Sequence, residues 1–577
     1  MKKIYFFSML LAAGMFASCS SDDVVGNGGQ QAFEGDGEMQ VALNFGRTTG
    51  SRASGNENGT LEESRVKSAQ FYFFKADGTY LGTSGKLDNL GQEATTADGN
   101  VERQLNVEVP SNAVKDLYND KSAKVKVIAV LNADKFAPTL TENTSKESDF
   151  NKAVEEANAT TVNFMMTNSV YADASDVKEN ITPSDGNVQI TYDNVYRKGL
   201  KPTNYTPVTM YVERVCSKVN LKLKSDDNGA DLKPNDGEFT VKSWALNVTN
   251  QKYYPVKKIT NIFSAENAAL KTLWSNVTNT SEKTVGWSNA AAHRSYWAED
   301  PNYNDGNNGY SSDFKVINFD ALNGKLGTPA YCLENTFSNT AQKRDQTTQA
   351  VVLTQFKLTG ATEPSDIVLY NSKRYTTQNF LNVVMGSDNA VLQSGKYYKK
   401  TGDNYTTLAT ADFKLDKGAG KEDVTVDLNG TSTVIGCDGG KKIAFADGVG
   451  DIYTKNGNDY TKVTDASTAL TDLTSSVGKY TVFVGGYSYY VIPIRHFDDT
   501  EVPLTPTGIN GANQIGRYGI VRNHTYNLTI NSVKNLGNPI EGKTIKPEDK
   551  PDDTEDLLMD VTINVLSWAV RGQDIDL

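Results

Sequence analysis

Cys19 is the residue whose surroundings most clearly predict a covalent reaction. Two lysines precede an apolar run over residues 4–15, and small residues come directly before the cysteine. A charged and apolar leader of this kind is typical of a signal peptide, and it is too short to span a bilayer stably. The pattern resembles a lipobox, in which residues 1–18 are removed and the cysteine thiol carries a diacylglyceryl group. An ordinary signal peptide that happens to contain a cysteine is the alternative.

The other cysteines and the histidines do not form a catalytic or metal-binding pattern. Cys216, Cys332 and Cys437 are odd in number and widely spaced, which predicts buried free thiols and not a disulfide framework or a set of metal ligands. The three histidines lie far apart, and the chain contains no HExxH, GxSxG or Walker A motif. We therefore expect no enzyme, no cofactor and no metal. The chain has too many carboxylates for a catalytic pair to be identified from the sequence, so a glycosidase stays an alternative.

One acidic segment superficially resembles a calcium loop. Residues 300–306 read DPNYNDG, but the glycine stands at the seventh position, where the loop needs it at the sixth. The twelfth position is Ser311 and not a bidentate glutamate. We interpret this segment as a solvated loop.

Composition predicts a folded, strand-rich protein. The chain has 577 residues, enough for two or three domains, and contains 28 Tyr and 22 Phe together with many β-branched residues. Its net charge is -12, and its basic residues are dispersed. A nucleic-acid partner would require a basic stripe, so we expect none.

Short alternating strands recur along the chain. Met39, Val41, Leu43 and Phe45 are apolar with polar residues among them, and residues 105–109 alternate in the same way. Residues 124–131 are nearly continuously apolar, which predicts a strand buried on both faces. Two segments of similar design, residues 396–403 and 451–460, predict hairpins. The spacing of residues 150–157 predicts a helix, and the polar residues 260–345 predict long loops.

The C-terminus combines a linker with a last strand. Residues 543–556 are charged and contain prolines, which is typical of a linker. Beyond them Val561, Ile563 and Val565 alternate with polar residues, and two further apolar residues follow, Trp568 and Val570.

Taken together, these segments resemble those of the fimbrillins of type V pili, and within them the minor (short) fimbrillins of Gram-negative anaerobes. The likeness covers nearly the whole length and rests on the order and spacing of several short segments. These are the lipobox at Cys19, the early strand before Arg52, and residues 124–132, 212–219, 489–493, 521–526, 533–537, 565–568 and 574–577.

The resemblance implies an all-β fold with two transthyretin-like β-sandwich domains, long loops and few short helices. We assign these domains to residues 53–217 and 218–542, after a lipidated tether at 19–38. A linker and C-terminal donor strand at 543–577 would follow. The family's precursor is anchored in the outer membrane, and an arginine-specific protease cuts it after an arginine. The partners implied are copies of the same chain, tip and anchor subunits, and ligands on host or bacterial surfaces.

The cut would lie in a loop-like segment that contains two arginines. Arg52, which precedes Ala53, matches the family pattern better, and Arg47 is the alternative; both could also be solvated loop charges. Cleavage at Arg52 would remove a propeptide strand within residues 39–52. A sandwich that lacks one strand exposes unpaired backbone groups and apolar pockets, which a strand from another subunit can fill.

The C-terminal strand is the candidate donor for that groove. The alternative is that it completes its own C-terminal domain.

Other functions also stay open. The chain could be a surface lipoprotein that binds glycans through aromatic loops at 270–310 and does not polymerise, or it could be a tip or anchor component. The favoured reading is a polymerising shaft subunit on the cell surface.

Overall fold

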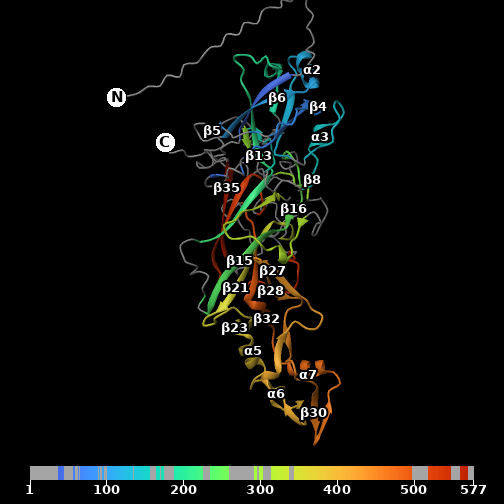
Figure 1. Ribbon diagram of the computed structural model, residues 1–577, viewed down its shortest axis with the longest axis vertical. Helices are drawn as coiled ribbons and strands as arrows, with labels where there is room; N and C mark the ends of the chain where they lie inside the picture. Colours follow the sequence, from blue (N-terminus) through green and yellow to red (C-terminus); the bar gives the residue numbers. More distant parts are fainter. Residues whose placement is uncertain are drawn as a thin grey trace, which may run out of the picture.

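The computed structural model shows an elongated, mostly β molecule with few short helices (Figure 1). It describes residues 37–44, 56–58, 63, 65–88, 90, 94–95, 101–133, 136–155, 164–168, 171–173, 188–224, 234, 236–258, 292–294, 298–302, 314–336, 344–496, 518–533, 535–547 and 559–569.

The N-terminal region is built around a ten-stranded sheet. The main path runs in the order β4-β3-β7-β9-β13-β1-β6-β5, with β11 beside β7 and β12 beside β1. One apolar core joins side chains from both halves of this path, and helix α2 (Ser111–Asn119) adds Val114 and Leu117 to it. The strands are β1 (Gly37–Asn44), β3 (Ala69–Lys75), β4 (Tyr80–Thr83), β5 (Ala94–Thr95), β6 (Val101–Val109), β7 (Val125–Leu131), β9 (Met166–Asn168), β11 (Val188–Ile190), β12 (Tyr196–Arg197) and β13 (Val208–Arg214).

Strand β7 confirms the prediction of a strand buried on both faces. Val127 and Ala129 belong to the core that contains β1, whereas Ile128 and Val130 belong to a second core. That second core also includes Val215 and residues from the following domain. A continuous apolar run is needed here because both faces of β7 are covered.

The C-terminal region is a sandwich of two sheets. The chain passes from β13 in the first region to β14 in the second at Val215. A five-stranded sheet in the order β2-β35-β34-β14-β20 and a three-stranded sheet, β15-β21-β33, share one apolar core. The strands are β2 (Asn56–Asn58), β14 (Cys216–Leu223), β15 (Gly237–Asn247), β20 (Ala330–Leu333), β21 (Gln349–Leu358), β33 (Tyr487–Pro493), β34 (His524–Val533) and β35 (Met559–Ala569).

A separate core lies between β21 and β33 in sequence and was not predicted. Its residues come from 368–482, and in Figure 1 its elements extend away from the N-terminal sheet. The elements of this distal unit are β22 (Ile367–Tyr370), β23 (Lys373–Thr376), α5 (Thr377–Val384), α6 (Ala390–Gln393), β24 (Tyr397–Thr401), β25 (Asn404–Thr407), β26 (Phe413–Asp416), β29 (Lys442–Phe445), β30 (Ile452–Asn456), β31 (Asp459–Lys462), α7 (Ala466–Leu473) and β32 (Tyr480–Phe483).

The two predicted hairpins are confirmed, and they pair with each other. They form one four-stranded sheet in the order β25-β24-β30-β31. Each turns at a glycine with positive φ, 63° at Gly402 and 61° at Gly457, a conformation that costs glycine little. The rings of Tyr405 and Tyr460 stack across the sheet with centroids 4.0 Å apart.

Shorter elements complete the described fold. Hairpin β27 (Asp423–Leu428) and β28 (Thr431–Cys437) packs on the outer face of β21. The remaining strands are β8 (Val154–Glu155), β10 (Tyr171–Asp173), β16 (Thr249–Asn250), β17 (Lys252–Tyr253), β18 (Ala292–Arg294) and β19 (Phe314–Lys315). The short helical turns are α3 (Glu147–Phe150), η2 (Tyr192–Asn194), η5 (Phe319–Ala321), η6 (Arg344–Gln346), η7 (Thr410–Asp412) and η8 (Val484–Gly486).

Three expectations need correction. The helix predicted over residues 150–157 is wrong, because α3 ends at Phe150 and β8 follows at Val154–Glu155. The loops expected at 260–345 include a true strand, since β20 pairs with β14. The linker expected from residue 543 begins within the body, because Ile545 is buried and its amide donates to the carbonyl of Ile317.

Candidate functional site: strand β1 and its slot, and strand β35

Strand β1 occupies the middle of the N-terminal sheet. It pairs antiparallel with β6 along its whole length. On its other edge it pairs antiparallel with β12 at its start and parallel with β13 from Val41 onward. A strand in this position is hydrogen-bonded on both sides, so its removal would leave the facing edges of β6 and β13 unpaired.

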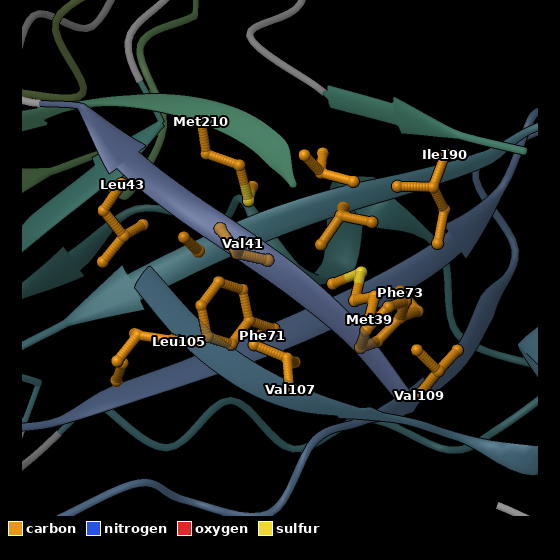
Figure 2. Close-up of a cluster of buried hydrophobic side chains, with 14 of the residues drawn as sticks. Met39, Val41, Leu43, Phe71, Phe73, Leu105, Val107, Val109, Ile190 and Met210 are labelled. Carbon is orange, nitrogen blue, oxygen red and sulfur yellow. The ribbon is translucent and has the colours of Figure 1, made fainter. Parts of the chain in front are cut away.

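The apolar side chains of β1 point into the core. Met39, Val41 and Leu43 have 0% exposure. Figure 2 shows them among other side chains of the same core, including Phe71 and Phe73 of β3. The period-two pattern predicted for this strand is confirmed for these three residues. We call the space that they fill, between β6 and β13, the β1 slot.

The beginning of the slot admits no side chain. A Cβ atom at Gly37 would lie 2.7 Å from Val114 Cγ2 and 2.8 Å from Val195 Cγ1. Both neighbours are branched core residues that have little room to move. Sequence reasoning did not identify Gly37 as part of the site; its place two residues before Met39, on the same face of the strand, is the available signal.

Polar contacts hold the other face of β1. The backbone N–H of Gln40 donates to the hydroxyl of Tyr205 at 3.2 Å. Lys201 Nζ donates to the side-chain oxygen of Gln40, Oε1, at 2.7 Å. The amide of Gly199 donates to a carboxylate oxygen of Glu38 at 3.1 Å. The segment 199–205 therefore lies over the outward face of β1.

Strand β35 contains the predicted C-terminal strand, and it pairs within its own chain. It runs antiparallel to β34 from Met559 to Ser567, with Val565 opposite Tyr526 and Ile563 opposite Leu528. Ile563 is partly buried against the C-terminal core. Val561 and Trp568 also lie in β35. This arrangement corresponds to the alternative in which the strand completes its own domain.

The other edge of β35 carries the short strand β2. The three residues of β2 run parallel to the end of β35, with Asn56 opposite Ser567. Strand β2 follows β1 in the sequence, and residues 45–55 connect the two. The ends of the two candidate strands are thus linked through one short segment.

Several predicted site residues lie outside the described residues. These are Cys19, Phe45, Arg47, Arg52 and Val570. Arg47 and Arg52 belong to the segment between β1 and β2.

Buried charges join the two regions near β13 and β14. Glu213 pairs with Lys257 at 3.5 Å, whereas the side chain of its neighbour Arg214 donates to Asn523 at 3.1 Å. The two adjacent residues therefore bind different partners at the domain junction, as alternation along a strand predicts. A second buried pair joins Arg522 and Glu334. Removing one partner of such a pair would leave an uncompensated buried charge.

The cysteines have the environment of inert thiols. Cys216, Cys332 and Cys437 are free and buried, as predicted. Burial raises the pKa of Cys216 to about 12, so the reactive thiolate is strongly disfavoured.

The structure brings together two histidines that are distant in sequence. The rings of His496 and His524 lie 5.5 Å apart, and both are buried. His496 Nδ1 lies 2.8 Å from the hydroxyl of Tyr526, and His524 Nδ1 lies 2.9 Å from the carbonyl oxygen of Arg522. These contacts are those of structural side chains.

The segment that resembled a calcium loop is not solvated at its start, because Asp300 and Asn302 are both buried. Asp300 accepts hydrogen bonds from Asn302, Asn250 and the amide of Thr336, and burial raises its pKa to about 6. Within the part of the chain that the structure describes, no three His, Cys, Asp or Glu side chains gather as metal ligands would. Among the same residues, no helix has the length and apolar character needed to cross a membrane.

Comparison with known families agrees with this architecture. Residues 38–214 match the family model of the major fimbrial subunit protein FimA, and residues 481–574 match that of the fimbrillin C-terminal region. Two regions of the chain thus match fimbrillin families, one near its start and one near its end. The first begins within β1 and ends with β13, and the second contains β34 and β35. The matched families are those of fimbrial subunits, which supports a structural role for this chain in a cell-surface fimbria.

Solved structures of fimbrial proteins are distantly similar to this chain. A FimA fimbrillin from Porphyromonas gingivalis is 11% identical, with 93% of this chain and 99% of that chain covered and a TM-score of 0.33. A fimbrial assembly protein from Parabacteroides distasonis is 13% identical, with 71% and 98% covered and a TM-score of 0.27. The tip fimbrial protein Mfa3 from Porphyromonas gingivalis is 10% identical, with 92% and 100% covered and a TM-score of 0.27. No curated protein matches the chain by sequence.

Proposed function

We propose that this chain is the precursor of a shaft subunit that polymerises by strand exchange. The chain is exported as a lipoprotein anchored in the outer membrane through Cys19, and an arginine-specific protease cuts it after Arg52. Strand β1 then leaves its slot, and β35 of another copy takes its place. The resulting fimbria, completed by tip and anchor subunits, supports adhesion to host or bacterial surfaces and biofilm formation.

The observation that carries this proposal is the position of β1. Its three buried side chains contribute about 5–9 kcal/mol as an upper bound, at about 1.5–3 kcal/mol for each fully buried residue. That stabilisation keeps the slot filled while β1 remains tied to the body. Once the tie is cut, only these non-covalent contacts hold β1, so it can dissociate from the body and leave the slot open.

The pairing of β35 with its own β34 is compatible with exchange. In its own sheet β35 has one long ladder, with β34, and a three-residue contact with β2. In the slot, an incoming strand would find unpaired backbone groups along β6 on one edge and along β12 and β13 on the other. Exchange therefore replaces one long ladder by ladders on both edges.

Cleavage of the precursor tests the proposal. Precursor without its lipid is treated with limiting trypsin, and its products are examined by N-terminal sequencing and electron microscopy. We expect filaments whose subunits begin at Ala53. Arg52→Ala should reduce assembly strongly, and the double variant with Arg47→Ala should abolish it. Arg65→Ala, at an exposed arginine beyond β2, is the matched control and should assemble normally.

Two results would overturn the proposal. Normal filaments from the Arg47→Ala/Arg52→Ala variant would exclude cleavage in this segment. Normal filaments from a chain that ends before Met559 would exclude β35 as the strand that is exchanged.

A further inference from the structure

At its C-terminal end, over Ser567–Ala569, strand β35 is an interior strand of its sheet. Strand β34 covers one edge and β2 covers the end of the other, with Glu57 opposite Trp568 and Asn58 opposite Ala569. An interior strand can leave a sheet only when the ladders on both sides break. A strand exchange that uses β35 must therefore first break the pairing between β2 and β35.

The pairing of β2 with β35 is weak by itself. It comprises three residues, Asn56, Glu57 and Asn58, and contains no apolar side chain. A pairing this short is marginal by itself and persists because the surrounding chain keeps β2 close to its partner. The two segments that flank β2 thus determine whether it stays paired.

The segment that follows β2 is firmly anchored at the domain junction. Glu63 is 2% exposed. Its carboxylate pairs with Lys218 at 3.2 Å and accepts a hydrogen bond from the hydroxyl of Tyr331 at 2.6 Å. Its carbonyl oxygen accepts from Arg214 Nε at 2.9 Å. These contacts come from side chains of β13, β14 and β20, and none of the three is made by β1.

The segment that precedes β2 is tied to β1. Residues 45–55 connect Asn44, at the end of β1, to Asn56. While this segment is intact, β2 is held from both sides, by β1 in its slot and by Glu63. A cut after Arg52 leaves β2 three residues from a free N-terminus, with Glu63 as its remaining anchor.

We propose that β2 is a clasp that holds β35 on its own subunit until the segment between β1 and β2 is cut. The inference rests on the strand exchange proposed above and adds regulation to it. A single cut has two effects, because it frees β1 from the body and lets β2 fray as a chain terminus does. Strand β35 then becomes an edge strand that can separate from β34. An uncut chain offers neither an open slot nor a free donor strand.

A reversible covalent lock tests the clasp. Asn56 and Ser567 are directly opposite, so Asn56→Cys with Ser567→Cys places two thiols on paired strands. After cutting, the oxidised variant should lose its β1 peptide but assemble at least tenfold more slowly than wild type. Dithiothreitol should restore assembly to within about twofold. The Ser567→Cys single variant is the matched control and should assemble under both conditions.

The outcomes of the lock experiment separate the two proposals. Wild-type rates from the oxidised, cut double variant would overturn the clasp and leave strand exchange standing. No assembly by cut wild type, or by the Ser567→Cys control, would instead overturn the proposed function. If only the double variant fails to assemble after reduction, the substitutions themselves impair assembly. The hydrogen-exchange measurement described next then tests the clasp.

Hydrogen exchange tests whether the cut itself releases the strand. In dilute wild-type protein, measured before assembly, cutting should speed amide exchange in residues 559–569 at least tenfold and leave β33 unchanged. Glu57→Pro, which removes a backbone N–H from β2, should speed exchange of the same residues without any cut. Equal protection of β35 before and after cutting would overturn the clasp.

Discussion

Strands β1 and β35 have similar alternating sequences but lie in different environments. Strand β1 is paired on both edges, and its inward side chains have 0% exposure. Strand β35 is paired along its length with β34, and Ile563 is only partly buried. An alternating pattern thus predicts a strand but not the depth at which it packs. The three buried side chains of β1 stabilise the filled slot, whereas Ile563 of β35 packs less deeply and contributes less.

A charge in the slot should have the largest effect on this comparison. Val41→Asp would place a carboxylate at a fully buried position of the apolar core, which costs at least about 3 kcal/mol. We expect β1 to leave the slot in the uncut precursor, with a matching drop in urea stability of the N-terminal region. Gln40→Asp, on the partly exposed face of the same strand, is the control. Equal stability of the two variants would contradict the depth assigned to β1.

Truncated side chains should rank the two strands directly. Leu43→Ala removes a fully buried side chain and should destabilise the precursor by about 2–5 kcal/mol. Ile563→Ala removes a partly buried one and should cost about 1 kcal/mol, because part of that side chain is already in water. Urea unfolding of both precursors measures the difference. A larger loss for Ile563→Ala would reverse the comparison.

The closed beginning of the slot should be sensitive to a single methyl group. Gly37→Ala would force Val114 and Val195 apart and should cost about 1–3 kcal/mol through overpacking. Gly542→Ala is the matched control, because a Cβ there meets no atom within 4 Å. Thermal unfolding of the two variants compares them. A Gly37→Ala precursor as stable as the control would mean that the slot end is looser than its geometry indicates.

The smallest expected effect concerns a thiol that shares the core with β1. Cys216 belongs to the cluster that contains Met39 and Val41, whereas Cys437 lies in β28. The pKa of Cys216, raised to about 12, keeps it protonated from pH 7 to 9, so iodoacetamide should label it very slowly in the precursor. After β1 is removed, labelling of Cys216 should accelerate relative to Cys437. Unchanged labelling would show that the core stays closed without β1.

Local patterns in the sequence were sufficient to predict several strands. The alternation of Met39, Val41 and Leu43 and the apolar run of β7 follow from burial on one face and on two faces. The hairpins at Gly402 and Gly457 follow from turn chemistry that lies within a few residues. The helix expected at 150–157 failed because Phe150 and Val154 have helical spacing but pack as parts of α3 and β8.

Features that depend on distant partners could not be predicted from the residues alone. Strand β2 has no apolar residue, and its conformation is set by pairing with β35, which lies some five hundred residues along the chain. Glu63 shows no local sign of its burial, because its partners come from β13, β14 and β20. The slot itself is defined by β6, β12 and β13, whose order around β1 is a property of the folded sheet.

The distal unit places two tight turns far from the N-terminal sheet that contains β6 and β13. Gly402 and Gly457 lie at the ends of its hairpins, and a Cβ at either position meets no neighbouring atom. In Figure 1, β30 stands at the opposite end of the molecule from β6 and β13. Foreign epitopes inserted at these turns would be displayed once per repeat along a filament, which makes this unit a natural carrier for multivalent antigen presentation.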